Sequence, residues 1–595
     1  MKPPSNIFFK ASINTKLYLL VILAFFLTIG FIKSNGSGGL PDASPNNGGL
    51  FLPGGFKAVV VADSIGRARH LAVNTNGDIY VKLRIPINGK GSVAMRDNNN
   101  DGKADQIEYF GDYPDVGNYG TAMRIHKNYL YFSTAGEVFR TKLSAGKLVP
   151  EGKSELLLSD DYLKDVHGYS HIAKPIAFDT KGNMYVPFGS PSDACQVKNK
   201  QPGSPGHAPC PELERHAGIW KFSDSKPNQK LEDGVRYATG IRSAVALAWN
   251  ESDNSLYALQ HGRDGLNRGW PDIYNPWQSA LLPSEEFFKI PEGTDGGWPY
   301  YYYDYMKGKK LLNPEYGGDG IKEGNSKSVA QPLVGFPGHF APNDLFFYTG
   351  NQFPERYKNG AFIAFHGSTI RAPYPQGGYI VGFVPFKNGK PSGDWEVFAD
   401  GFPVVDTIVN TSNSVYRPMG IAMGPDGSLY LSESVKGKIW RIMYPGDKKK
   451  FSNQDLVEMQ KRKETQPHIK TPDIIKDNLN RGQLLAGEKL YTTYCGTCHQ
   501  GDGKGDGTRF PPLERSEWVR GDKRKLINIV LNGLSGPITV NGVGYNETMP
   551  PNSYLKDDQI AQILTYVRAN FKNNTTAVST AEVARERKLG TKQGN

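Results

Sequence analysis

The segment Gly77-Asp78-Ile79-Tyr80-Val81 is the first of six copies of one short pattern, a glycine or asparagine turn followed by an apolar stretch that usually contains tyrosine. The other copies begin at Asn128, Gly182, Asn254, Gly360 and Gly427. Such a pattern is typical of a turn that leads into a buried β-strand. Because one strand signature recurs between residues 50 and 445, the sequence predicts a six-bladed all-β propeller. A β-sandwich with insertions is the alternative.

A second motif, C-G-T-C-H at residues 495–499, is the attachment pattern of c-type haem. The thiols of Cys495 and Cys498 can reach the two vinyl groups of one haem, and His499 then lies beneath the iron as its proximal ligand. Met549 follows in a proline-stiffened loop and is the expected second axial ligand. A redox dithiol or half of a zinc site is the alternative. No second pair of cysteines or histidines lies nearby to complete a zinc site, so we predict haem c.

The 595 residues of the chain are too many for one hydrophobic core, so several domains are expected. The propeller is assigned to residues 50–445. A small all-α cytochrome c domain is assigned to residues 480–572, where apolar residues recur at helical spacing before and after the haem motif. The charged stretch 446–479 is predicted to be a linker, and residues 573–595 a polar tail.

The N-terminal 35 residues place Lys2, Lys10 and Lys16 ahead of an apolar run over residues 17–32. This pattern predicts an export signal or a retained membrane anchor, with a buried core helix as the alternative. Residues 36–49 are expected to be flexible. The protein is therefore expected in the periplasm or another extracytoplasmic compartment. Its net charge is +11, but no nucleic-acid motif accompanies the charge, so we expect no nucleic-acid partner.

The two cysteines outside the haem motif are Cys195 and Cys210, so only one intramolecular pairing is possible. They flank a loop rich in proline and glycine, and an exported protein can keep a disulfide. We predict that they form one, with two free thiols as the alternative.

Polar side chains come just before or within the first apolar stretch of four repeats. They are Arg69 with His70, then His171, Arg242 and Arg417. In a propeller, the loops that enter the innermost strands line one mouth of the central channel. Arginines that converge there with a histidine beside them favour an anionic ligand. Independent surface ion pairs are the alternative.

Short segments in a fixed order carry a family resemblance across nearly all of residues 50–444. Among them are Leu52-Pro53-Gly54-Gly55-Phe56, Gly240-Ile241-Arg242, His261-Gly262-Arg263-Asp264 and Phe365-His366-Gly367-Ser368. The sequence resembles the soluble quinoprotein sugar dehydrogenases, and more closely the sorbosone or pyranose dehydrogenase group. This resemblance implies pyrroloquinoline quinone (PQQ) with calcium as cofactors and a sugar as substrate. The C-terminal part resembles a class I cytochrome c.

Carried over by position, the resemblance implies that His171 is the catalytic base. It would remove the proton of the substrate hydroxyl while hydride passes to the quinone. Arg242 and Arg417 match residues that clamp PQQ carboxylates. The backbone carbonyls of Gly262 and Arg263 match ligands of the calcium beside PQQ.

Two departures from the family pattern affect this site. Ser243 stands where the family often has asparagine. Thr369 and Ile370 replace the Trp-Asn pair of the family segment that ends in arginine, here Arg371. The resemblance implies that Arg371 still contacts the cofactor, in a changed pocket.

A loop that begins at Asp97 satisfies the twelve-residue calcium-loop pattern. The expected ligands are Asp97, Asn99, Asp101, the Lys103 carbonyl, Asp105 and Glu108. The flanking residues indicate strands, so a calcium-bound hairpin is predicted. An acidic turn without metal is the alternative.

Together these features predict a quinohaemoprotein dehydrogenase. It would oxidise an aldose, sorbosone or a similar sugar at PQQ and pass electrons through haem c to an external acceptor. One alternative is an eight-bladed quinohaemoprotein alcohol dehydrogenase. The other is a propeller without PQQ that acts as a carbohydrate-binding or electron-transfer protein.

Overall fold

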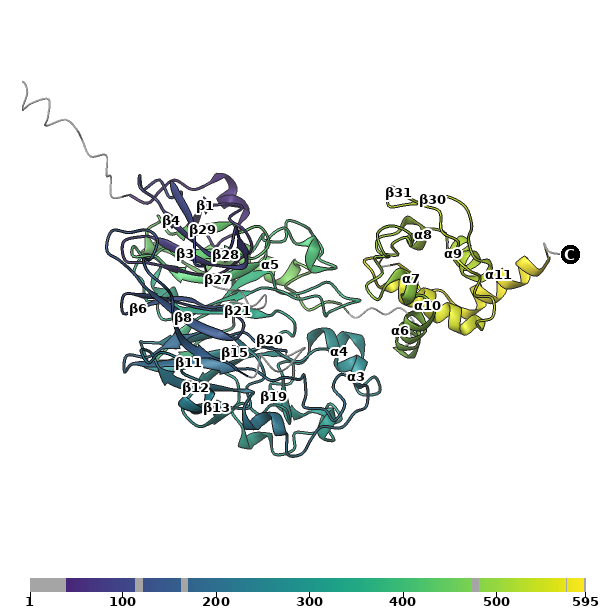
Figure 1. The fold of residues 1–595 in the computed structure, drawn as a ribbon, viewed down its shortest axis with the longest axis horizontal. Helices are drawn as coiled ribbons and strands as arrows, with labels where there is room; N and C mark the ends of the chain where they lie inside the picture. The colour runs from purple at the N-terminus through teal and green to yellow at the C-terminus, as the bar shows by residue number, and fades with distance from the viewer. Residues whose placement is uncertain (1–38, 113–120, 162–169, 474–480, 574, 593–595) are drawn as a thin grey trace, which may run out of the picture. The chain divides into compact units, whose positions relative to one another are not determined.

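The structure, a computed structural model, describes residues 39–112, 121–161, 170–473, 481–573 and 575–592. Within these residues, six sheets each contain four antiparallel strands, and one of the six adds a short parallel strand. They are the blades of a six-bladed propeller, which confirms the predicted fold and excludes an eight-bladed one. In Figure 1 the propeller strands run from purple to green and the C-terminal helices from yellow-green to yellow.

The strands of each blade are close neighbours in the sequence. Blade one consists of β2 (Ala68–Val73), β3 (Ile79–Ile87), β4 (Lys90–Arg96) and β5 (Gln106–Phe110). Blade two consists of β6 (Met123–His126), β7 (Tyr129–Ser133), β8 (Glu137–Lys142) and β9 (Glu155–Ser159). Blade three consists of β10 (Ala177–Phe178), β11 (Asn183–Phe188), β12 (Gly218–Ser223), β13 (Val235–Thr239) and the short parallel strand β17 (Thr294–Asp295). Blade four consists of β14 (Ala244–Asn250), β15 (Ser255–Gln260), β16 (Glu285–Ile290) and β20 (Val334–Phe336). Blade five consists of β21 (Pro342–Phe347), β22 (Ala361–Phe365), β23 (Ile380–Val384) and β26 (Glu396–Ala399). Blade six consists of β27 (Pro418–Met423), β28 (Leu429–Glu433), β29 (Ile439–Met443) and β1 (Lys57–Ala62).

The last blade closes the ring, because its outer strand comes from the beginning of the propeller. Strand β1 pairs antiparallel with β29, with Lys57 opposite Met443 and Val60 opposite Trp440. The two ends of the propeller sequence therefore hold each other, which satisfies edges that would otherwise be open.

The recurring sequence pattern marks the hairpin between the first and second strand of each blade. At this turn Gly77, Gly182 and Gly427 have φ angles of 91°, 92° and 85°. Asn128 and Asn254 take the same role at 63° and 51°. Positive φ is readily adopted by glycine and tolerated by asparagine, so these residue types are selected by the turn.

Aromatic side chains fill the space between neighbouring blades. Phe56 packs edge-on against Phe353, Tyr357 and Phe398, with ring centroids 4.8, 5.3 and 5.2 Å apart. Such pairs each contribute about 0.5–1.5 kcal/mol beyond the burial of apolar area. This packing fixes the blades against one another and therefore positions the loops at the channel mouth.

Shorter elements lie in the loops between strands. They are the helices α3 (Leu266–Gly269) and α4 (Pro276–Leu281) and the hairpins β18–β19 (Tyr301–Asp304, Lys309–Leu312) and β24–β25 (Phe386–Lys387, Lys390–Pro391).

The C-terminal domain is helical, as predicted, with one small hairpin that the prediction lacked. Its elements are α6 (Arg481–Tyr494), α7 (Gly496–His499), α8 (Glu517–Arg520), α9 (Lys523–Asn532), β30 (Ile538–Val540), β31 (Val543–Tyr545), α10 (Asp557–Ala569) and α11 (Thr580–Lys592). Helices α6 and α10 cross closely at Gly487, where a Cβ atom would lie 2.2 Å from the carbonyl oxygen of Gln562. A glycine at this position therefore lets the two helices approach.

The described part of the segment predicted to be a charged linker, residues 446–473, is folded. It forms short 3-10 turns, η8 (Lys448–Lys450) and η9 (Asn453–Leu456), followed by α5 (Val457–Thr465). Met459 and Ile469 are buried in the propeller core, and His468 bonds to the buried Asp400 at 2.9 Å. The prediction differs here because widely spaced apolar residues anchor an otherwise polar segment.

The predicted polar tail and part of the predicted flexible segment are also structured. Val578 and Val583, the latter on α11, are buried in the core of the C-terminal domain. Near the N-terminus, η1 (Pro45–Gly49) follows Ser44, whose backbone N–H donates to the carbonyl of Ala58 at 2.9 Å. In both places a few contacts order a sequence whose composition is mostly polar.

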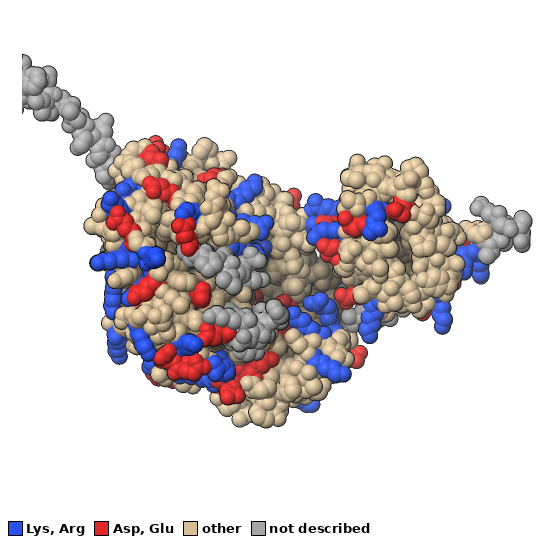
Figure 2. Space-filling model, in the orientation of Figure 1, with Lys and Arg blue, Asp and Glu red and all other residues tan. Residues whose placement is uncertain are grey.

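The predicted signal or anchor over residues 1–35 lies outside the described residues. Among the helices that the structure does describe, none has both the length and the apolar character needed to span a bilayer. Figure 2 shows acidic and basic side chains interspersed over the visible face of the propeller rather than gathered into one basic stripe.

Candidate functional site

The innermost strands of four blades begin beside the arginines and the histidine singled out in the sequence. Arg69 lies at the start of β2, and His171 precedes β10. Arg242 precedes β14, and Arg417 directly precedes β27. Asp193 links His171 with Arg242. The charges of Arg417 and Arg69 both act on His366. His261 joins the two groups, since its carbonyl accepts from Arg242 and its charge acts on His366.

His171 is held as a neutral imidazole with a defined tautomer. Its Nδ1 lies 2.7 Å from the carbonyl oxygen of Ser190, which can only accept a hydrogen bond. The proton therefore sits on Nδ1 and leaves a lone pair on Nε2. Burial, reinforced by the charge of Arg242 and opposed by Asp193, lowers the pKa of His171 to about 3. The residue also has a φ of 59°, a strained conformation of the kind that clusters at functional sites.

Asp193 connects His171 with Arg242. Its Oδ1 lies 3.8 Å from Nε2 of His171 and accepts a hydrogen bond from the Arg242 guanidinium. Burial alone would raise the pKa of Asp193, but Arg242 and His171 are among the groups that bring it below its usual range. The second guanidinium nitrogen of Arg242 donates to the carbonyls of His261 and Gly262, each at 3.1 Å. Arg242 is thus fixed from both sides.

The other side of the mouth carries three arginines around a histidine. Arg417 bonds to the ring of His366 at 2.8 Å and to its carbonyl oxygen at 3.1 Å. The pKa of His366 lies well below its usual value because of burial, and Arg417, Arg69, Arg84 and His261 each lower it further. We define these three arginines, Arg69, Arg84 and Arg417, as the arginine cluster.

Arg371 does not join the arginine cluster. Its Nε donates to the carbonyl of Ala280 at 2.7 Å, and its guanidinium lies 5.5 Å from the ring centre of Phe340. Burial lowers its pKa to about 10. Its two terminal nitrogens make no hydrogen bond with the described residues. The charges of Arg371 and Arg417 both act on Tyr379. The contact of Arg371 with the cofactor that the resemblance implies stays a prediction.

The Gly262 carbonyl, one of the two expected to hold calcium at the mouth, already binds a guanidinium. The carbonyl of Gly262 accepts from Arg242, and its N–H donates to Glu285 at 3.0 Å. The side chain of Arg263 forms a buried ion pair with Glu315. A guanidinium thus occupies the carbonyl that a cation would need, so this arrangement does not fit the metal.

The predicted calcium loop is a hairpin turn between β4 and β5 whose oxygens accept hydrogen bonds from within the loop. Asp105 accepts from the backbone N–H groups of Asn98 and Asn99, and Asp97 accepts from that of Gly102. Glu108 lies on β5 opposite Ala94, away from the loop. Across the described ranges, no three acidic, histidine or cysteine side chains gather to hold a metal. The structure therefore does not support the expected ligand set at Asp97, Asn99, Asp101, Lys103, Asp105 and Glu108.

Cys195 and Cys210 form the predicted disulfide. Cys195 is fully buried and follows Asp193 by two residues. The indole of Trp298 also donates to the Asp193 carbonyl at 3.0 Å. The disulfide and this hydrogen bond together hold the loop that positions Asp193.

In the C-terminal domain, one cavity brings together all four residues predicted to bind haem. Cys495, Cys498, His499 and Met549 line it with apolar side chains from α9 and α10. Burial raises the pKa of the Cys495 thiol to about 11. An apolar cavity lined by two thiols, a histidine and a methionine suits the covalent attachment of a haem.

The two axial ligands are oriented by backbone contacts. Nδ1 of His499 lies 2.9 Å from the carbonyl oxygen of Pro511, so the lone pair of the ring is on Nε2. The Met549 backbone pairs with Leu534 through two hydrogen bonds of 2.8 and 3.0 Å. Both ligands are therefore held in place by the protein fold itself.

Sequence reasoning missed the roles of Asp193, His366 and Arg84. Asp193 lies in a loop without a recurring pattern, and only its nearness to Cys195 could have drawn attention to it. His366 belongs to a segment that carries the family resemblance, but its contact with Arg417 depends on the closed ring of blades. Arg84 lies on β3, outside the loops that the sequence analysis considered.

Three family models match parts of the chain. Residues 118–371 match glucose/sorbosone dehydrogenase, residues 320–445 match a TrAA12-like model, and residues 484–570 match cytochrome c. Two solved structures share the propeller fold at low sequence identity. One is the Trichoderma reesei carbohydrate-active enzyme of family AA12, with a TM-score of 0.53, 15% identity and coverage of 67% of this chain and 97% of that one. The other is the PQQ domain of Coprinopsis cinerea pyranose dehydrogenase, with a TM-score of 0.51, 16% identity and coverage of 68% and 98%.

Curated relatives match over shorter stretches. Cytochrome c-552 of Thermus thermophilus is 39% identical over 85 residues, which are 14% of this chain and 64% of that protein. An uncharacterized protein of Borreliella burgdorferi is 28% identical over 217 residues, which are 36% of this chain and 51% of that protein. The cytochrome c subunit of a quinone alcohol dehydrogenase of Gluconobacter oxydans is 33% identical over 116 residues, 19% of this chain and 24% of that subunit. The chain thus spans between about a quarter and 64% of the length of these relatives.

The chain therefore carries a six-bladed propeller that contains a match to the glucose/sorbosone dehydrogenase family, an oxidoreductase family. A cytochrome c domain follows the propeller in the sequence.

Proposed function

We propose that the protein is a quinohaemoprotein dehydrogenase that oxidises a sugar at PQQ in the propeller mouth and passes the electrons to a covalently bound haem c. One observation carries this proposal. A neutral histidine with a free lone pair, His171, lies 3.8 Å from Asp193, which also accepts a hydrogen bond from Arg242, and the charges of the arginine cluster act on His366. The loops that supply these residues come from different blades, so their convergence is a property of the fold.

The charge of the arginine cluster fits PQQ, which carries three carboxylates. Guanidinium groups bind carboxylates through paired hydrogen bonds. Arg417, Arg69 and Arg84 would hold the carboxylates, with Arg242 beside them. When bound, PQQ supplies a carbonyl carbon that accepts hydride. The calcium expected beside it does not fit the present arrangement of Gly262 and Arg242, and no step depends on it.

His171 is the residue placed to act as the base. Its Nε2 would take the proton of a sugar hydroxyl while the hydrogen on the same carbon leaves as hydride. Asp193, 3.8 Å from Nε2, would stabilise the imidazolium that forms. The hydrogen bond from Nδ1 to Ser190 keeps the ring in the orientation that this transfer requires. The proton and the hydride together remove two hydrogens and two electrons from the sugar.

The C-terminal cavity fits haem c. Cys495 and Cys498 would attach it, and His499 and Met549 would ligate the iron, which supplies one-electron transfer. We extend the proposal to an external electron acceptor and to a location outside the cytoplasm. The disulfide Cys195–Cys210 supports that location, because disulfides persist mainly in oxidising compartments.

Titration of the purified full-length chain with PQQ tests the proposal. We expect saturable binding, followed by reduction of an artificial dye when glucose, sorbosone or another aldose is added. The carbohydrate-binding alternative predicts sugar binding without dye reduction at any PQQ concentration. That result, with correctly incorporated haem, would overturn the proposed activity.

A further inference from the structure

A groove of about 950 Å³ lies on the propeller between blades four and five, beside α5. Strand β14 begins just after Arg242 and ends at this groove with Asn250. Strand β23 likewise begins just after Tyr379, whose ring centre lies 5.5 Å from the Arg417 guanidinium, and ends shortly before Phe386 in the groove. A strand of this length spans roughly 20 Å. The groove therefore lies at the opposite end of the blades from the channel mouth.

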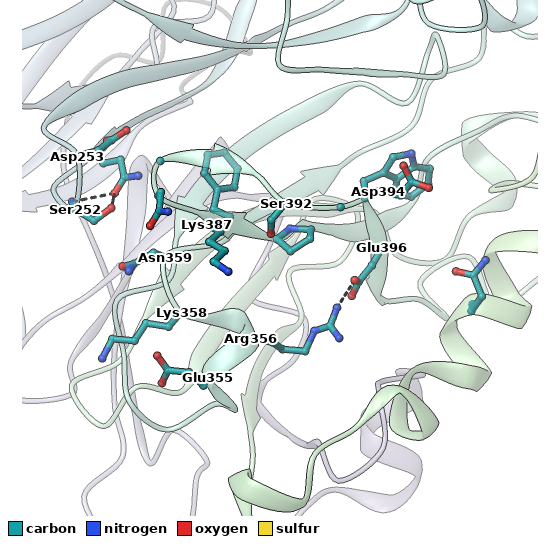
Figure 3. A pocket seen from close by; sticks show the side chains of 18 of the residues that line it. Ser252, Asp253, Glu355, Arg356, Lys358, Asn359, Lys387, Ser392, Asp394 and Glu396 are labelled. Carbon is teal, nitrogen blue, oxygen red and sulfur yellow. Dashed lines mark hydrogen bonds and ion pairs between the residues drawn. The ribbon is translucent and has the colours of Figure 1, made fainter.

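The groove is polar but has no net formal charge. Four acidic and four basic side chains line it, together with four amides and two serine hydroxyls. Figure 3 shows the pair Arg356–Glu396 on one side of the groove and Asp253 with Ser252 on another, with Lys387 and Asn359 between them. Because opposite charges balance, the groove offers no field that would concentrate a polyanion or a polycation. Its volume lies in the upper part of the range for ligand pockets, about 300–1,000 Å³.

Two buried polar atoms in the groove have no hydrogen-bond partner among the described residues. One is an acceptor, Oδ1 of Asp253, whose Oδ2 accepts from Tyr257 at 2.6 Å and Lys289 at 2.8 Å. The other is a donor, Nε of Arg356, whose terminal nitrogen is bonded to Glu396. Such an atom is costly when it stays unpaired. Each of the two side chains is partly exposed, so a turn of the side chain would bring its unpaired atom to a ligand hydroxyl, which both donates and accepts.

An aromatic wall accompanies these polar groups. Phe386 is half-buried, and Phe347 holds it edge-on with ring centroids 5.4 Å apart. Trp395 follows in the same groove and is covered on one face by the Lys463 ammonium at 4.0 Å. A fixed ring beside donors and acceptors offers an apolar surface against which the C–H face of a sugar ring can pack.

We infer that this groove binds a neutral oligosaccharide, at a site separate from the channel mouth. The inference does not rest on the proposed dehydrogenase activity, because no residue of the groove belongs to the mouth. Hydroxyls of the ligand would pair with Asp253 and Arg356, and a sugar ring would pack on Phe386. The balanced charge of the groove selects against phosphorylated or uronic-acid sugars.

Isothermal titration calorimetry of the full-length haem-containing protein tests this inference. The probes are cellotetraose, maltotetraose and xylotetraose, with tetragalacturonate as the charged comparison. We expect at least one neutral tetrasaccharide to bind and tetragalacturonate not to bind. Asp253→Asn should weaken that binding on the order of tenfold, as expected for one lost hydrogen bond to a charged group.

Controls separate this site from the mouth and from misfolding. Asp233→Asn makes the same change at an exposed acid that pairs with Lys226, and should bind like the wild type. Ser392→Trp fills the groove by bulk and should abolish binding even if Asp253→Asn fails to fold. His171→Gln alters the mouth alone and should leave the affinity unchanged. No binding by any neutral probe, or binding that survives Ser392→Trp in a folded protein, would overturn the inference.

Discussion

The channel mouth and the haem pocket are built in opposite ways. In the haem pocket, three of the four residues that would attach or ligate the haem lie within the five residues 495–499, and the cavity around them is apolar. At the mouth, His171, Arg242 and Arg417 come from different blades, and the site is defined by buried charge. A covalent cofactor needs a local chemical motif, whereas an anionic cofactor held by noncovalent bonds needs a rigid scaffold. Changes at the two sites should therefore have different consequences.

The largest effect is expected from the haem-attachment cysteines. Replacing both Cys495 and Cys498 by alanine should abolish covalent haem, because no thioether can form. Mass spectrometry and a haem stain of the denatured protein measure this loss. The matched control replaces Cys195 and Cys210, which should leave the haem content unchanged. Full covalent haem in the first variant would contradict the assignment.

A large effect on turnover, without loss of PQQ, is expected at the mouth. His171→Gln should lower kcat by roughly 10²–10⁴-fold, the usual contribution of a general base. The affinity for PQQ should remain near that of the wild type. Steady-state kinetics with a dye acceptor and a PQQ titration separate the two quantities. His126→Gln, at a histidine that pairs with Asp224 elsewhere on the propeller, is the control. Equal activity of both variants would remove His171 from the mechanism.

A moderate effect on cofactor binding is expected from the arginine cluster. Arg417→Gln should weaken PQQ binding by roughly tenfold to a hundredfold, because it removes a charged hydrogen-bond donor. Arg441→Gln removes a comparable charge from a pair with Asp426 outside the mouth and should not change PQQ binding. If both substitutions weakened binding equally, general electrostatic attraction and not the cluster would be responsible.

The smallest effect is expected on the way the free energy of unfolding of the propeller depends on pH. Burial lowers the pKa of His70 and of His216 from 6.5 to about 4 in the folded protein. The unfolded chain therefore binds more protons below pH 6.5, so the free energy of unfolding is highest above that pH and falls toward pH 4. Each histidine contributes a slope on the order of 1 kcal/mol per pH unit.

Denaturant unfolding between pH 7 and pH 4, followed by propeller tryptophan fluorescence, measures this slope. His70→Gln should make it shallower, even if the variant is less stable at neutral pH. A slope that does not change would show that His70 is already protonated in the fold.

The sequence predicted most of the fold because the features that define it are local. Gly77 and Asn128 lie in turns that need positive φ, and each turn directly precedes the second strand of its blade. The haem ligands were predicted for the same reason. By contrast, the positions of α5 and α11 depend on a few buried residues. Met459 packs against propeller residues that are distant in the sequence, and Val583 packs in the core of the C-terminal domain.

The mouth was predicted in part. His171, Arg242 and Arg417 follow from their equivalent places before the inner strands, whereas Asp193 comes from a loop that only the folded chain brings beside them. Arg371 stays a prediction, because its Nε donates to the Ala280 carbonyl while its two terminal nitrogens have no partner among the described residues.

Rapid anaerobic mixing of an aldose with the full-length, PQQ-loaded protein tests the central claim most directly, with the absorbance of the haem as the signal. The account predicts that the haem is reduced in the wild type without any added mediator, and that reduction is slowed by at least a hundredfold in His171→Gln, within the range for a lost general base. Reduction at the same rate in both proteins, or no reduction with any aldose while PQQ is bound, would contradict it.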